Sequence, residues 1–190
     1  DIGCDAVKFQ LFKIDQLFST EVLSQSKEHM DRANWELPFE FVPKIYERCQ
    51  KKKISFSCTP FYIDAVDELL PYVDFYKVAS YELLWDDLLI KCAESGKPVI
   101  ISTGMANLEE IKHAVSVLKA HGCKNPKILH CSSAYPTPIH SANLAAIQTI
   151  RSNTNCEVGW SDHTVSETVI LNSILKWNAT IIEFHLDLDG

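Results

Sequence analysis

Apolar and polar residues alternate along the chain in seven short runs that are typical of β-strands. The runs cover residues 6–10, 55–61, 75–80, 99–103, 127–133, 157–163 and 180–187. In the last run one face carries Ile182 and Phe184, whereas the other carries Glu183 and His185, because residues two apart share a face of a strand. A carboxylate and an imidazole on one face of an otherwise apolar strand indicate a chemical role near its end.

Helical periodicity fills most of the intervals between these strands. Leucines and small apolar residues from Leu84 to Ala93 recur at helical spacing, and Gly96 follows as a C-terminal cap. A second helix begins with Asn107 and Glu110 in the spacing of a capping box and ends before Gly122. Residues 164–167 predict another capping box, with Thr164 as the N-cap. The polar segment 15–37 predicts a long loop with short helical pieces.

Strands that alternate with helices predict right-handed crossovers and a parallel sheet, and therefore an α/β fold. Seven such strands without a glycine-rich dinucleotide fingerprint favour a barrel over an open, doubly wound sheet. A (β/α)8 TIM barrel needs eight strands and about 250 residues. We therefore expect residues 1–190 to form a single, incomplete TIM-barrel domain that lacks the first βα unit.

The composition of the chain argues against nucleic-acid and membrane partners. A formal net charge of −7 argues against nucleic-acid binding, and the only basic run, residues 51–53, is placed where a helix should end. No apolar stretch approaches the length of a membrane span, so no membrane partner is expected. The seven cysteines are scattered without a CxxC pair, which favours a reducing, cytoplasmic setting.

Polar side chains gather where the predicted strands end, which is the functional face of a barrel. A single Ser or Thr at such a position is usually a turn or helix cap, but seven polar strand ends in succession are poorly explained that way. These side chains include Lys8, Gln10, Thr59, Lys77, Ser80, Glu82, Ser102, Ser133, Tyr135, Ser161, His163, Glu183, His185 and Asp187.

The residue types predict the chemistry of this cluster. Lys8 and Lys77 would need anions if they point into a barrel, because an unpaired buried ammonium costs several kcal/mol. Two lysines and several hydroxyls suit a phosphate and a carboxylate. His163 and His185, on adjacent strand ends, could share one divalent metal ion, although two histidines alone are a weak metal signal. Glu183 is expected to pair with inner polar groups, with Lys8 as one candidate.

Seven stretches together resemble the N-acetylneuraminate (sialic acid) synthase family, which includes the legionaminic and pseudaminic acid synthases. In chain order they are DAVKFQ, SCTPF, KVASYEL, PVIISTGM, LHCSSAYPTP, GWSDHT and EFHLDLD. The resemblance covers nearly the whole chain. It implies an enzyme that condenses phosphoenolpyruvate with an open-chain N-acetylhexosamine, with release of phosphate, to form a nine-carbon 2-keto acid.

The resemblance also implies roles for individual residues. Phosphoenolpyruvate would be held by Lys8, Thr59, Lys77, Ser80, Ser102, Ser133 and Ser161. The sugar site would be lined by Gln10, Glu82 and Tyr135. Lys8, Lys77 and Glu82 are the candidate catalytic residues. His163 and His185 would bind Mn²⁺, or alternatively Mg²⁺ or Co²⁺.

The sequence departs from the family pattern in several places. The family's first strand with its Glu, and its C-terminal antifreeze-like domain, have no counterpart in these 190 residues, and some members carry Asn where this chain has Ser133. We therefore expect a fragment that is inactive alone and a parent protein that is a homodimer. Three alternatives remain: a Schiff-base aldolase that uses Lys77, a synthase that accepts a sugar phosphate, and a non-catalytic remnant that binds a phosphorylated ligand.

Overall fold

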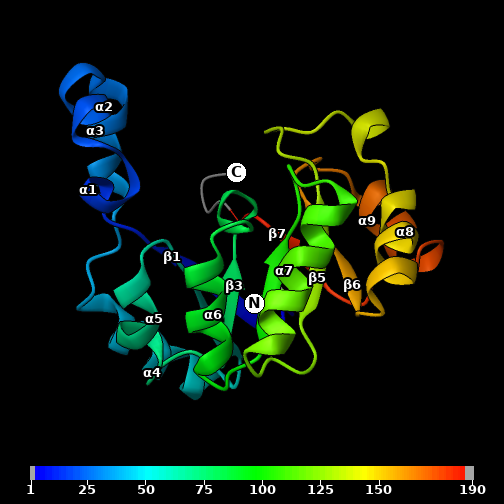
Figure 1. Cartoon of the computed structure of the whole chain (residues 1–190), viewed down its shortest axis with the longest axis horizontal. Helices are drawn as coiled ribbons and strands as arrows, with labels where there is room; N and C mark the ends of the chain where they lie inside the picture. Colours follow the sequence, from blue (N-terminus) through cyan, green and yellow to red (C-terminus); the bar gives the residue numbers. More distant parts are fainter. Residues whose placement is uncertain (1–2, 187–190) are drawn as a thin grey trace.

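The computed structural model describes residues 3–186 and shows a single curled sheet with helices on its outer side (Figure 1). Its seven strands are all parallel and lie side by side in chain order, β1 to β7. Their bounds are β1 Ala6–Leu11, β2 Ser55–Pro60, β3 Phe75–Val78, β4 Val99–Ser102, β5 Lys127–Cys131, β6 Val158–Asp162 and β7 Ile182–Phe184. This arrangement confirms the predicted incomplete α/β barrel.

Helices connect successive strands, as parallel pairing requires. The longer ones are α4 Phe41–Lys52, α5 Ile63–Leu69, α6 Asp86–Glu94, α7 Leu108–Ala120, α8 Ala145–Thr154 and α9 Glu167–Leu175. Short 3₁₀ turns occur at η2 Ser80–Glu82 and η3 Ile139–Ser141. Every helix within residues 3–186 is too short or too polar to cross a bilayer.

The segment after β1 forms an arm that projects from the body of the molecule (Figure 1). It contains α1 Ile14–Leu17, α2 Thr20–Gln25, α3 Lys27–Asp31 and the 3₁₀ helix η1 Arg32–Trp35, none of which has a fully buried residue. The prediction of a polar loop with short helical pieces is therefore confirmed.

Strand alternation separates the apolar core from the polar interior. On β3, Tyr76 and Val78 are fully buried in the apolar core, while Lys77 between them has polar partners. On β6, Trp160 belongs to the same core and Ser161 points the other way. Because the outward residues are apolar and the inward ones are polar, the chemistry is placed inside the curl of the sheet.

Most predicted helix ends are confirmed. Asn107 and Glu110 form the expected capping box of α7, and Gly96 and Gly122 follow α6 and α7 in left-handed conformations. The basic run ends α4, with Lys53 in a left-handed conformation.

The prediction that Thr164 caps α9 is wrong, because its backbone N–H and hydroxyl both bind the Asp162 carboxylate and the helix begins later, at Glu167. β7 is also shorter than predicted. The predicted end of that strand, Asp187, lies outside the described residues.

Candidate active site

Glu183 on β7 is the centre of the polar cluster inside the sheet. Its carboxylate accepts a hydrogen bond of 3.0 Å from the Ser161 hydroxyl. Its oxygens lie 3.7 Å from the Lys77 ammonium and 4.0 Å from that of Lys8. The structure therefore confirms that Lys8 is a partner of Glu183, and it adds Lys77, which comes from the far side of the curl.

Lys77 carries a positive charge into the interior. Its side chain is only 3% exposed, and its Nζ donates to the Ser102 hydroxyl at 2.6 Å and to the Val78 carbonyl at 3.0 Å. Burial lowers its pKa, and the nearby Lys8 adds to that effect, whereas Glu183 opposes it. Two hydrogen-bond acceptors and one shared carboxylate hold the ammonium in place.

The two ammonium groups beside Glu183 outnumber its single carboxylate. Burial opposes ionisation of Glu183, but Lys77, Lys8 and the Ser161 hydroxyl outweigh it and leave the pKa of Glu183 lowered. One carboxylate therefore faces two ammonium groups. The interior of the sheet carries an excess positive charge that would attract an anion.

Small side chains form a cradle beside these charges. The Ser80 hydroxyl accepts a hydrogen bond of 3.0 Å from the backbone N–H of Gly104 and lies 3.3 Å from the Cys131 thiol. A Cβ at position 104 would lie 3.0 Å from the Ser80 hydroxyl and 2.8 Å from the Cys131 sulfur, and it would collide with the Ser133 hydroxyl. Glycine at 104 therefore keeps these polar groups close together.

The aromatic rings of Tyr135, His163 and His185 lie close together in another part of the cluster. The Tyr135 ring lies 4.1 Å from that of His163, and the His163 and His185 rings are 5.3 Å apart with a tilt of 31° between their planes. The His163 Nδ1 donates to the Ser132 carbonyl at 2.8 Å, so Nε2 is the ring nitrogen that remains for another partner. Burial, followed by the charges of Lys8 and His163, lowers the pKa of His185 and favours its neutral form.

Two imidazoles fit one divalent ion only in part. No group of three or more His, Cys, Asp or Glu side chains in residues 3–186 is arranged as a metal site. The two histidines could thus supply two nitrogen ligands, and water or substrate would have to complete the coordination.

The main chain at His163 is held firmly on both sides. Its carbonyl accepts a hydrogen bond of 2.7 Å from the Thr137 N–H. The next turn is fixed by the buried Asp162 carboxylate, which accepts from the Trp160 indole at 2.9 Å and from the Thr164 hydroxyl at 2.7 Å. Asp162 points away from His163 along the strand, so it shapes the strand end without joining the site.

The remaining predicted site residues have no hydrogen bond to the cluster around Glu183. Thr59 and Glu82 are buried, and one oxygen of each has no partner among the described residues. Burial raises the pKa of Glu82 to about 7, partly offset by a backbone hydrogen bond and the charge of Lys77. Gln10 is exposed near the end of β1.

Sequence reasoning missed two features of this site. The Cys131 thiol lies against Ser80, but its place in an apolar run concealed any polar contact. Gly104 follows β4 with no turn signal that would distinguish it from an ordinary loop glycine. Neither residue could be assigned before the strands were placed side by side.

Comparison with known proteins agrees with the resemblance seen in the sequence. The model of the NeuB family matches residues 1–190. The chain belongs to the NeuB family.

Two relatives indicate what family members do. The chain is 35% identical to N,N'-diacetyllegionaminic acid synthase of Campylobacter jejuni, covering 100% of this chain and 60% of that protein. The crystal structure of N-acetylneuraminic acid (sialic acid) synthetase from Leptospira borgpetersenii, in complex with citrate, superposes with a TM-score of 0.86 at 34% identity and covers 95% of this chain and 62% of that one. The NeuB chain described here thus spans about three fifths of the length of each.

A more distant structure supports the fold alone. The DAHP synthase of Thermotoga maritima is 16% identical, with a TM-score of 0.65 over 78% of this NeuB chain and 46% of the other. The same barrel architecture is therefore shared beyond the family.

Proposed function

We propose that the protein to which this NeuB chain belongs condenses phosphoenolpyruvate with an open-chain N-acetylhexosamine aldehyde to form a sialic-acid-type 2-keto acid. The methylene carbon of phosphoenolpyruvate forms the new bond to the aldehyde carbon, whose oxygen takes up a proton and becomes a hydroxyl. Water supplies the new oxygen at the phosphate-bearing carbon. Cleavage of the C–O bond then releases inorganic phosphate.

The observation that carries this proposal is the excess positive charge inside the sheet. Lys8 and Lys77 face one carboxylate, and hydroxyls surround them, so the site has the charge and the donors for a small molecule with a phosphate and a carboxylate. The relative from Leptospira was crystallised with citrate, a polycarboxylate, which supports an anion site in this family.

The side chains then divide by role. Lys77 and Lys8 neutralise the anion, and the hydroxyls of Ser80, Ser102, Ser133 and Thr59 donate to its oxygens. Ser161 would contribute through Glu183, to whose carboxylate its hydroxyl donates. Thr59 suits this role because its buried hydroxyl oxygen has no partner in residues 3–186. Gln10, Glu82 and Tyr135 would contact the sugar.

Glu82 is a candidate for proton transfer. Burial raises the pKa of its carboxyl to about 7, so at neutral pH both its protonated and its ionised forms are populated. A group with a pKa near the operating pH can both donate and accept a proton efficiently. Glu82 would thus exchange a proton with the aldehyde oxygen or with water.

A divalent ion, Mn²⁺ by resemblance to the family, would be held by His163 and His185. When bound, such an ion would polarise the aldehyde carbonyl.

In the complete polypeptide, His185→Ala should lower Mn²⁺ affinity at least about 10-fold, as expected from the loss of one nitrogen ligand. Electron paramagnetic resonance of free Mn²⁺ measures the affinity. His113→Ala, on the surface, is the control. Equal Mn²⁺ affinities of the His185 variant and the wild type would contradict the metal assignment.

The reaction itself is tested by phosphate release. The complete polypeptide is incubated with phosphoenolpyruvate and a panel of N-acetylhexosamines, first with Mn²⁺ and then with a chelator. Release that requires a sugar and stops with the chelator supports the proposal. Release without any sugar, or none with every sugar despite bound phosphoenolpyruvate, contradicts it.

A Schiff-base aldolase is the second candidate, and the lowered pKa of Lys77 is the observation that favours it. A buried amine that deprotonates more easily has a larger share of its neutral form, which is the nucleophile. Reduction with borohydride in the presence of a keto-acid substrate distinguishes the two, because only an imine at Lys77 would be trapped as a stable adduct.

A further inference from the structure

Val165, in the turn between β6 and α9, has a backbone conformation that its side chain disfavours. Its φ is 55°, in the left-handed region, where a β-branched residue is a steric outlier. The side chain is 90% exposed, so no packing contact compensates for this strain. Strained backbone of this kind persists only where the surrounding structure fixes it, and it clusters at functional sites.

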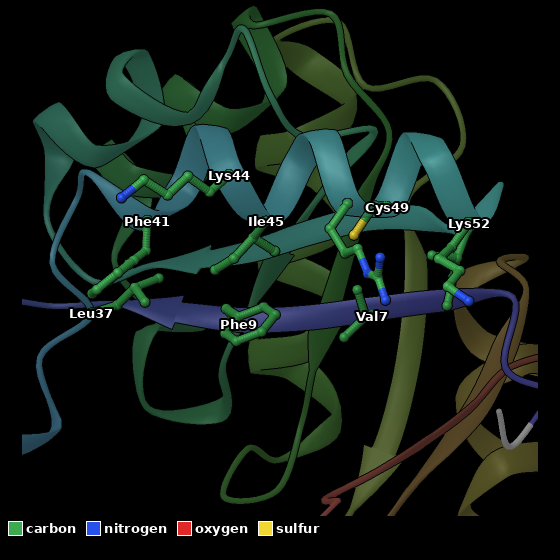
Figure 2. Close-up of a pocket in the computed structure, with 10 residues that line it drawn as sticks. Val7, Phe9, Leu37, Phe41, Lys44, Ile45, Cys49 and Lys52 are labelled. Atoms are coloured by element: carbon green, nitrogen blue, oxygen red, sulfur yellow. The ribbon is translucent and has the colours of Figure 1, made fainter.

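The other non-glycine residues with positive φ within residues 3–186 have an ordinary explanation. Three are asparagines, which adopt the left-handed region more readily than other residues: Asn143, Asn155 and Asn178. The fourth is Lys53, which follows Lys52 at the end of helix α4 (Figure 2) and donates its N–H to the Cys49 and Gln50 carbonyls. Lys53 therefore closes a helix, whereas Val165 precedes one and closes none.

The Asp162 carboxylate holds the turn at Val165. One of its oxygens accepts hydrogen bonds from the backbone N–H groups of Thr164 and Val165, at 3.2 and 3.1 Å. The other accepts from the Trp160 indole and the Thr164 hydroxyl. Asp162 is only 4% exposed and forms no ion pair in the part of the chain that the structure describes. Four neutral donors thus stabilise a buried charge that would otherwise be costly.

His163 lies inside this turn, between Asp162 and the strained residue. β6 ends at Asp162, so His163 is the first residue that the sheet no longer holds. On its other side, the Thr137 N–H donates to the His163 carbonyl at 2.7 Å, and the ring Nδ1 donates to the Ser132 carbonyl at 2.8 Å. The direction of the remaining Nε2 therefore depends on where the turn places the main chain of His163.

The second histidine of the site has no comparable support. His185 follows the three-residue strand β7, and its ring contacts those of Tyr135 and His163 without a hydrogen bond to any residue in 3–186. His163 is thus the rigid member of the pair, and its Nε2 fixes the point at which an ion could be bound.

We propose that Asp162 and the left-handed turn at Val165 position His163 for the divalent ion. The carboxylate holds residue 165 in its strained conformation, and the turn directs the His163 Nε2 toward the ion. Asp162 and Val165 are positioning residues, because both act through His163. The proposal rests on the proposed role of His163 as a metal ligand. It predicts that the backbone conformation at position 165, rather than the side chain there, controls Mn²⁺ binding.

Two substitutions at position 165 of the complete polypeptide separate the backbone from the side chain. Val165→Gly removes the side chain but permits the left-handed conformation, so Mn²⁺ affinity should stay within about twofold of the wild type. Val165→Pro fixes φ at about −65° and removes the N–H that Asp162 binds. Its affinity should fall about 10-fold, as expected when the support of a metal ligand is lost. Electron paramagnetic resonance of free Mn²⁺ measures both, and a similar change in the two variants overturns the proposal.

Substitutions of the anchor keep the test decisive if the proline variant does not fold. Asp162→Ala should lower Mn²⁺ affinity about 10-fold. The control Thr164→Val removes one donor to the same carboxylate but keeps both N–H bonds, so its affinity should stay within about twofold of the wild type. Adding Val165→Gly to Asp162→Ala should restore most of the loss, because glycine adopts the left-handed conformation without the carboxylate. Wild-type affinity in Asp162→Ala, or no restoration by glycine, overturns the proposal.

The His163 ring gives a readout that needs no metal. Nitrogen-15 NMR of the metal-free polypeptide should show a single Nδ1–H tautomer of His163 in the wild type and in Val165→Gly, and a mixture in Val165→Pro. A mixture in the wild type overturns the proposal without any variant. If the tautomer changes as expected but no variant, including His185→Ala, alters Mn²⁺ affinity, the positioning of the ring is confirmed and the metal assignment alone is contradicted.

Discussion

The ammonium of Lys77 is buried among a hydroxyl, a carbonyl and the shared carboxylate of Glu183. Lys77→Met keeps the length of the side chain but removes the charge. We expect the affinity of the complete polypeptide for phosphoenolpyruvate to fall about 100-fold or more, as loss of one partner of a buried charge pair costs about 3–5 kcal/mol. Titration calorimetry measures the change. Lys91→Met, which breaks a 2.8 Å surface ion pair with Asp67, is the control, and equal affinities of the Lys77 variant and the wild type would place Lys77 outside the site.

The carboxyl of Glu82 links pH to stability. Its folded pKa of about 7 lies above the ordinary 4.5, so the folded state retains a proton that the unfolded state loses. The free energy of unfolding should therefore fall as the pH rises from about 4.5 to 7, by about 3 kcal/mol in total for a shift of this size. Glu82→Gln should flatten this slope.

Urea unfolding at a series of pH values measures the effect of Glu82. The control is the exposed Glu21→Gln, whose curve should run parallel to that of the wild type. A Glu82→Gln curve with the full wild-type slope between pH 4.5 and 7 would show that another group is responsible.

At the residue scale, the sequence predicted which polar side chains lie together at the strand ends, but not which hydrogen bonds and ion pairs they form. Parallel strands bring their carboxyl ends to one edge, so Lys8, Lys77 and Ser161 could be grouped from the pattern alone. The role of Glu183 as the shared partner depends on the curvature of the sheet, which brings β3 opposite β7. That curvature is a property of the whole sheet, and no local pattern along the chain encodes it.

Helix α7 offers a direct test at the element scale. The Asn107 side chain accepts from the backbone N–H groups of Glu109 and Glu110, at 2.9 and 3.0 Å. Asn107→Ala should cost about 1 kcal/mol of stability. The matched control is Ser166→Ala at the N-cap of α9, where the side chain makes no cap hydrogen bond. Thermal unfolding of both variants measures the difference, and equal losses would contradict the capping argument.

These two helix starts also show what sequence patterns can predict. The Asn107 box forms, and its side chain accepts from the backbone N–H groups of Glu109 and Glu110. The box expected at Thr164 did not form, because the buried carboxylate of Asp162 binds the Thr164 hydroxyl and N–H more strongly than a helix end would. Local periodicity therefore predicts the elements, but a buried carboxylate nearby can still move a helix start, here from an N-cap at Thr164 to one at Ser166.

At the scale of the whole molecule, the contact between Lys8 and Glu183 joins the first and last strands across the opening of the sheet. The two side chains are 21% and 23% exposed and 4.0 Å apart, so Lys8→Met should change global stability by less than about 1 kcal/mol. Its local effect should be larger. β7 is three residues long and pairs on one side only within the described chain, so we expect hydrogen exchange in Ile182–Phe184 to become several-fold faster in the variant.

The control for this prediction is Lys127→Met, which removes a 3.2 Å surface ion pair with Glu157 between β5 and the residue that precedes β6. That variant should leave exchange at β7 unchanged, since the interior strands are held by pairing on both sides. Exchange that rises equally in both variants would mean that loss of any surface charge loosens the sheet. Exchange that rises in neither would mean that Lys77 and Ser161 hold β7 by themselves, and that closure of the curl does not depend on Lys8.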